Sequence, residues 1–276
     1  MASGTDGNII SFDASGNPVA IATGSDGQVL TSTGAGSPPA FEDAAGGGPT
    51  FKAFGTSSIM IGDDATGTID AANYNTGLGI DVFAALTTGD NNIAIGFSAA
   101  NDLTTGLNNI FVGSNAGDAI TTANNNIAIG HKALTVETAG NANTAVGYSA
   151  LENQNRTGGG NSYNVAMGFK AGEATTTGTS NTFLGSNAGI ANTTASYNTA
   201  AGYAALGANT TAEYNTAFGA NAMQAQTAGG NNCAFGYAAM YNCNNGSLVV
   251  RNTAMGYASM YQTTTDDNTA YGYYTY

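Results

Sequence analysis

Polar and apolar positions along this chain follow a pattern with a period of about 17 residues, which indicates one structural unit stacked many times. A unit opens with Asn, continues with small or apolar residues, reaches Gly four places after the Asn and has Ala three places further on, as in residues 92–99. A weaker unit opens with Ser58, which brings the total to 13 units. The others begin at Asn75, Asn92, Asn109, Asn126, Asn143, Asn164, Asn181, Asn198, Asn215, Asn232, Asn252 and Asn268.

The length and composition of the unit predict the fold class. Gly, Asn and Thr are weak helix formers, and at roughly 3.3 Å per residue the unit fits a coil of two short strands and two turns. We therefore predict an all-β fold, a parallel β-roll or β-solenoid of about 13 repeats of about 17 residues. Thr pairs such as Thr87-Thr88 should mark the second strand. The residues three places after the Asn are expected in the core: Leu78, Ile95, Val112, Ile129, Val146, Met167, Leu184, Phe218, Phe235 and Met255.

Two columns of the repeat have a structural interpretation. A position that is Gly in every unit predicts positive φ or a close approach of two backbones. Stacked Asn amides can hydrogen-bond along the axis as a ladder, although Asn can also serve simply as a turn former at the start of the strand. The predicted ladder comprises Asn92, Gly96, Asn109, Gly113, Asn126, Gly130, Asn143, Gly147, Asn181, Gly185, Asn198, Gly202, Asn215 and Gly219.

The first strand is apolar on both faces, because the residue two places after the Asn is also small or apolar, as in Ala94 and Phe111. A strand of this kind is covered on both sides. One cover is the interior of the coil, and the other could be a neighbouring chain. A narrow coil also buries little surface on its own, so we predict a closed oligomer.

Charge and targeting signals exclude several classes of partner. Only five residues are Lys or Arg, and the net charge is -13, which argues against nucleic acid or an anionic membrane. The chain shows no secretory signal and no transmembrane run, so we predict no membrane insertion and synthesis in a cytoplasm. Cys233 and Cys243 are too few for a disulfide framework or a metal site.

No catalytic motif is present in the sequence. His131 is the only histidine, which excludes histidine triads and multi-histidine metal sites. Acidic residues do not recur in one column, so the calcium-binding β-roll pattern fails. A carboxylate pair formed between chains by Glu152, Glu173, Glu213 or Asp residues stays open as an alternative. We predict that the protein is not an enzyme and uses no cofactor or metal.

Residues 1–50 differ from the rest and are predicted to be an attachment segment with a Gly/Pro-rich linker, followed by a repeat rod over 51–276. The segment from Gly24 to Phe41 resembles one found near the start of bacteriophage tail-fibre and other virion-fibre proteins. The repeats, typified by Asn143 to Leu151, resemble those of phage fibres and, more loosely, the head repeats of trimeric autotransporter adhesins.

The resemblance implies a homotrimeric fibre whose N-terminus binds tail or capsid proteins of a virion, the expected location after assembly in the host cytoplasm. A signal peptide and a C-terminal membrane anchor are missing from the sequence, and the period is longer than in the adhesins. These differences disfavour the version on a bacterial surface.

Tyrosines gather toward the C-terminus and are candidates for contact with a host surface glycan or protein, since the ring offers a flat apolar face and a hydroxyl. Their alternative role is a stacked ladder that seals the last coil. The candidates are Tyr271, Tyr273, Tyr274 and Tyr276. Two lengthened steps, Asn143 to Asn164 and Asn232 to Asn252, predict protruding loops.

Two other functions are compatible with the pattern. The chain could be an architectural virion spacer or decoration that carries another receptor-binding protein. It could also be an ice-binding solenoid, because the Thr pairs would form a regular hydroxyl array, although that array is interrupted near Asn155 and Asn244.

Overall fold

The computed structural model describes residues 9–12, 15–21, 28–31, 40–43, 50–54, 58–62, 72–243 and 249–275. The chain divides into two compact units, Met1–Gly48 and Pro49–Tyr276. In the first unit the described strands form two antiparallel pairs, β1 (Ile9–Phe12) with β2 (Pro18–Ile21) and β3 (Gln28–Thr31) with β4 (Ala40–Asp43). The predicted linker glycines at 46–48 lie outside the described residues.

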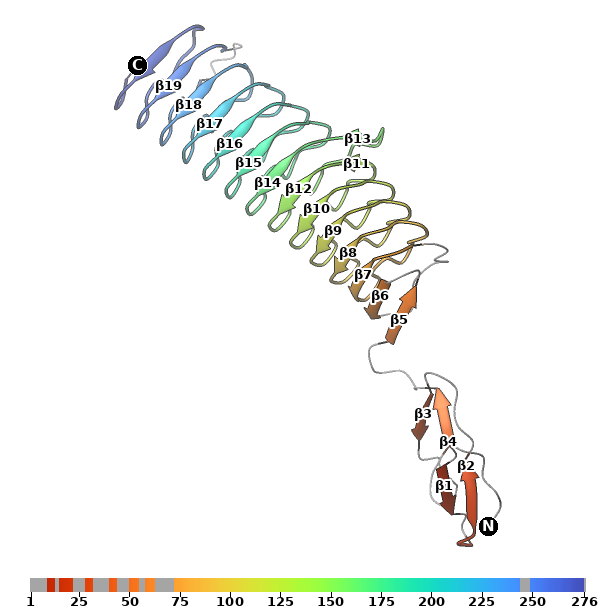
Figure 1. Ribbon diagram of the computed structural model, residues 1–276. Coiled ribbons are helices and arrows are strands. Elements are labelled where there is room, and N and C mark those ends of the chain that lie inside the picture. The colour runs from red at the N-terminus through yellow and green to blue at the C-terminus, as the bar shows by residue number, and fades with distance from the viewer. Residues whose placement is uncertain are drawn as a thin grey trace. The chain divides into compact units, whose positions relative to one another are not determined.

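The second unit is a solenoid built on one sheet of 14 strands (Figure 1). β5 (Thr50–Phe54) pairs antiparallel with β6 (Ser58–Gly62), and β6 pairs parallel with the next strand. All later strands of this sheet are parallel and in sequence order: β7 (Thr76–Gly79), β8 (Ile93–Ile95), β9 (Ile110–Val112), β10 (Ile127–Ile129), β12 (Thr144–Val146), β14 (Val165–Met167), β15 (Thr182–Leu184), β16 (Thr199–Ala201), β17 (Thr216–Phe218), β18 (Cys233–Phe235), β19 (Thr253–Met255) and β20 (Thr269–Tyr271).

These strands confirm the predicted all-β parallel solenoid, with about 11 turns of ~17 residues and no helix in the described part of the chain. The expectation of two strands per coil is wrong for the regular coils, since each contributes a single three- or four-residue strand. Left-handed residues such as Ser98, Ala100 and Asn108 break up the remainder of the coil into turns. The Thr pairs still join neighbouring coils, because Thr87 donates from both N and Oγ1 to the Thr104 carbonyl, at 3.0 and 3.1 Å.

The core column is the residue two places after the Asn, so the prediction that the third residue is buried is wrong. Ala94, Phe111 and Phe183 are fully buried, whereas Leu78 and Met167 are 46% and 47% exposed. Successive side chains of a strand point to opposite faces, so only one of the two positions can face the interior. The interior of the narrow coil has room only for the column two places after the Asn, which is mostly Ala.

Side-chain sizes compensate across the interior. The column two places after the Asn faces the column eight places after it, where Gly stands opposite Phe. A Cβ on Gly117 would lie 2.4 Å from the Phe111 ring, and one on Gly189 would lie 2.3 Å from the Phe183 ring. Where the first column is Ala, the second is usually large, as with Leu151. Most layers of the core thus reach close packing with their own pair of residues. In the coil of Ala166 and Gly172 both residues are small, and the side chains of Leu151 and Phe183 from the neighbouring coils fill the space at Gly172.

The Gly column has the conformation that the sequence pattern predicts. From Gly79 to Gly272 its φ values lie between +124° and +143°. A Cβ on Gly96 would stand 2.6 Å from the Gly113 carbonyl oxygen, closer than any real contact. Gly is therefore required both for the backbone angle and for the distance between successive coils.

The Asn column is buried and forms a continuous line of hydrogen bonds along the axis. Asn92 donates its backbone N–H to Asn75 Oδ1 at 2.8 Å, and Asn109 does the same to Asn92 at 3.0 Å. In most coils the side-chain Nδ2 also donates to a carbonyl 14 residues further on, as from Asn92 to Gly106 at 2.9 Å. The same backbone bond to the preceding Oδ1 is made by Asn126, Asn143, Asn164, Asn181, Asn198, Asn215, Asn232, Asn252 and Asn268.

The first lengthened step contains β13 (Gly160–Asn161), which pairs in parallel with β11 (Gly140–Asn141) of the preceding coil to form a small sheet away from the main one (Figure 1). Its base is held by Glu137, which is fully buried. Glu137 Oε1 accepts backbone N–H groups from Thr138, Ala139, Gly140 and Arg156 at 2.7 to 3.1 Å. Residues 244–248 of the second lengthened step lie outside the described residues.

Candidate functional site: the outward strip and its tyrosines

The outward face of the main sheet carries the side chains one and three places after each repeat Asn, and the side chain five places after it follows the Gly turn. We call these three columns, from Thr76 to Tyr273, the outward strip. None of its side chains is buried. Its large exposed apolar and aromatic members are Leu78, Ile80, Ile93, Phe97, Ile129, Tyr148, Met167, Phe169, Leu184, Tyr203, Phe218, Phe235, Tyr237, Met255, Tyr257, Tyr271 and Tyr273.

The outward strip contains no Asp, Glu, Lys or Arg over its whole length, although the net charge of the chain is -13. His131 is its one basic side chain. A monomer seldom exposes a contiguous apolar patch of more than a few hundred Å² unless that patch binds something. The strip is therefore the strongest candidate for a functional surface in the described part of the chain.

Aromatic rings within the strip stack along the axis. Tyr237, Tyr257 and Tyr273 form one stack with centroids 5.1 Å apart, and His131, Tyr148 and Phe169 form another at 5.2 and 5.3 Å. Because each ring covers the face of the next, inner members present mainly their edges to solvent. Partial desolvation, together with the neighbouring tyrosines, raises the pKa of Tyr257.

Three of the four predicted tip tyrosines lie in the last coil, and two of them, Tyr273 and Tyr274, are in contact. Tyr271 and Tyr273 are 63% and 73% exposed, the highest values among the large apolar side chains of the described residues. Tyr274 meets Tyr273 edge to face at 4.9 Å and Tyr257 at 5.6 Å. Tyr276 lies outside the described residues. Tyr257 belongs to the same cluster, and its register in the repeat was the available signal for including it.

Charged side chains lie on other columns of the coil and pair there. Lys132 is 3.6 Å from Glu152, and Lys170 is 2.9 Å from Glu173. Arg251 contacts Asp267 of the next coil at 2.6 Å, and this pair raises the pKa of the arginine and lowers that of the aspartate.

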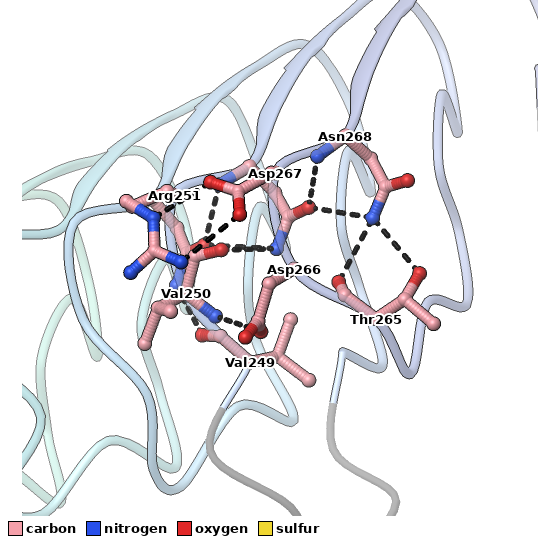
Figure 2. Close-up of polar contacts among 9 residues, drawn as sticks. Val249, Val250, Arg251, Thr265, Asp266, Asp267 and Asn268 are labelled. Carbon is pink, nitrogen blue, oxygen red and sulfur yellow. Dashed lines mark hydrogen bonds and ion pairs between the residues drawn. The ribbon is translucent and has the colours of Figure 1, made fainter.

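Figure 2 shows how side chains join these last two coils. Asp266 accepts the backbone N–H of Val250 at 3.0 Å, and Asn268 donates to the Thr265 carbonyl at 2.9 Å. These contacts are exposed to solvent, so each contributes little stability. The bond between Val250 and Asp266 crosses from one coil to the next, whereas the bond between Asn268 and Thr265 is local.

Within the described ranges, no group of three or more His, Cys, Asp or Glu side chains is placed to hold a metal ion. The same part of the chain has no helix long and apolar enough to cross a membrane. Comparison with protein-family models, with curated proteins and with solved structures finds no match for this chain.

Proposed function

We propose that the chain is a structural fibre of a phage virion, in which three copies associate side by side through the outward strip from Thr76 to Tyr257 and leave the last coil free at the tip. The observation that carries the association is the uncharged apolar strip along the solenoid. The segment from Gly24 to Phe41 and the repeats both resemble phage-fibre proteins, and this resemblance supports a place on a virion. In this function residues 1–50 attach the fibre to tail or capsid proteins, and the far end contacts the host surface.

The strip has the size of an interface. At ~4.8 Å per coil and about four residues of width at ~3.3 Å each, its area is roughly 700 Å². A standard protein interface covers about 800 Å² on each partner. Aromatic side chains, which are frequent on the strip, are also enriched in such interfaces.

A second copy of the same chain is the partner that fits best. It has the same distance between coils, so its columns match those of the strip along the whole length. Two copies would otherwise repel, since each carries a net charge of -13, and no Asp or Glu of one copy would meet its like across the strip. Because the chain turns at the Gly column, the strip has two facets, and a three-fold arrangement lets each facet contact a different neighbour.

The last coil would form the distal surface, where Tyr271, Tyr273 and Tyr274 from three chains gather. A glycan or protein on the host would bind each copy weakly. Multiple copies on one particle would supply the strength by avidity.

Light scattering of the purified protein tests the association. We expect the mass of three chains, and Phe218→Lys should shift the protein to a single chain because it places a charge in each interface. Thr194→Lys, which adds the same charge at an exposed position off the strip, is the matched control. A wild-type protein that remains monomeric at high micromolar concentration would sink the proposal.

Adsorption of virions tests the distal contact. Particles with Tyr271→Ala, Tyr273→Ala and Tyr274→Ala should lose most of their adsorption while keeping an intact trimer. Unchanged adsorption would leave the fibre as a spacer that carries another receptor-binding protein.

A further inference from the structure

Inside the solenoid, three consecutive coils use one carbonyl oxygen to accept two side-chain donors. In the coil that begins at Asn181, both Asn181 Nδ2 and Asn192 Nδ2 donate to the Ala195 carbonyl, at 2.8 and 3.1 Å. The two following coils repeat the arrangement. Asn198 and Asn209 share the Ala212 carbonyl, and Asn215 and Gln226 share that of Gly229.

The lengthened coil, from Asn143 to Tyr163, lacks this shared carbonyl. Four additional residues separate Asn143 from the next repeat Asn and displace the chain from the position where the accepting carbonyl stands in the regular coils. Asn143 Nδ2 and Gln154 Nε2, the equivalents of the two donors above, are buried and make no hydrogen bond within the protein. Asn143 Oδ1 accepts from the backbone N–H of Asn164, and Gln154 Oε1 accepts from Asn164 Nδ2. These two bonds fix the orientation of both amides and leave their nitrogens without a partner.

Glu137 Oε2 and Ser162 Oγ are also buried and without partners. Both lie against Gly140, since a Cβ there would be 2.5 Å from the first and 2.8 Å from the second. Glu137 occupies the same repeat position as Gln154 in the preceding coil, so it stacks directly beneath it.

We propose that these four side chains bind one structural water molecule. The water oxygen accepts from Asn143 Nδ2 and Gln154 Nε2 in place of the missing carbonyl, and its two hydrogens go to Glu137 Oε2 and Ser162 Oγ. All four groups and all four bonding directions of the water are then satisfied, as is usual for buried water. A bare cation does not fit the site, because two of the four groups are N–H donors.

A crystal structure at a resolution that shows ordered water tests the assignment. We expect one ordered peak at about 2.7 to 3.2 Å from each of the four atoms. A side-chain rotation that pairs Gln154 directly with Glu137 would overturn it. A peak with anomalous signal after a soak in rubidium would do the same, because it would mark a cation.

A deletion of residues 156–159 supplies the matched variant. It restores the ordinary length of the step and places the Asn161 carbonyl where the regular coils have their shared acceptor. The water should then be absent, with Asn143 and Gln154 both donating to that carbonyl. A peak that persists in the deletion variant contradicts the proposal. The outcome is independent of whether the chain forms a trimer or belongs to a virion.

Discussion

The inward and outward faces of the same strands use the same kinds of residue for different purposes. Phe183 on the inward face is fully buried, and the glycines at 172 and 189 leave the space that its ring fills. Phe218 on the outward face is 55% exposed and stacks only on Phe235, at 5.7 Å. Side chains on the inward face pack against residues of their own chain. Side chains on the outward face have no residues of the same chain packed over them. In the fibre that we propose, folding and assembly are thus encoded on alternate residues of one strand.

The largest difference between the faces should appear when each Phe is shortened. Phe183→Ala should lower the free energy of unfolding by about 3 to 5 kcal/mol, because it opens a cavity in a closely packed layer. Phe218→Ala should cost less than about 1 kcal/mol in the isolated chain. Urea denaturation at low protein concentration measures both.

The same pair of variants separates stability from assembly. At high concentration Phe218→Ala should weaken the trimer, whereas Phe183→Ala should leave the association of the remaining folded protein unchanged. Equal losses of folding stability for the two variants would show that the faces are not distinct.

Compensation across the interior can be tested by exchange of sizes. The double variant Phe183→Ala, Gly189→Leu reproduces the pair that stands in the coil of Ala200 and Leu206, where the Leu has φ +49°. It should recover about half of the loss caused by Phe183→Ala alone. Gly189→Leu without the exchange should be destabilising, because its Cβ would meet the Phe183 ring. Additive effects in the double-mutant cycle would contradict the size match.

The two cysteines report on the two faces by their reactivity. Burial raises the pKa of both thiols, and that of the inward Cys243 to about 12. At pH 8 an alkylating reagent should modify Cys243 about a thousandfold more slowly than a free thiol, since only the thiolate reacts. Cys233 on the outward strip should be protected in the trimer and become accessible in Phe218→Lys. Mass spectrometry of the labelled peptides distinguishes the two sites.

The raised pKa of Cys243 also predicts a loss of stability in alkali. Unfolded chains release this proton near pH 9.0, while the folded protein keeps it until about pH 12. Stability should therefore fall as pH rises between these values. Cys243→Ala should reduce this decline in stability with pH. An unchanged slope of stability against pH would show that Cys243 is not its cause.

The smallest effect concerns the left-handed residue that precedes each repeat Asn. Ala142 adopts φ +59°, a left-handed conformation that costs Asn less energy than Ala. The equivalent residues of three other coils are Asn91, Asn108 and Asn125. Ala142→Asn should stabilise the chain by about 0.5 kcal/mol. Thermal unfolding measures the change, and a decrease in Tm would contradict it.

The strict period was enough to predict the solenoid and the positive φ of the Gly column, because few structures need Gly once in every repeat. It did not show which face of the strand is inward, since Ala94 and Ile95 are both apolar. The second strand was predicted wrongly because ordinary residues such as Ala100, Leu134 and Met223 adopt left-handed turns that their types do not announce. The opposite sizes of Phe111 and Gly117 were the signal that identifies the inward column. The trimer and the tip contact stay predictions.

The hydrogen bonds between coils run along the axis, from each residue to its counterpart in a neighbouring coil. A pull on the two ends of the rod therefore loads all the bonds of a layer together, and a layer fails as a whole. Each failure should release about 60 Å of extended chain for a regular coil, and about 70 Å for each of the two lengthened coils, which begin at Asn143 and Asn232. Under force the rod should therefore extend in nearly equal steps, interrupted by two longer ones.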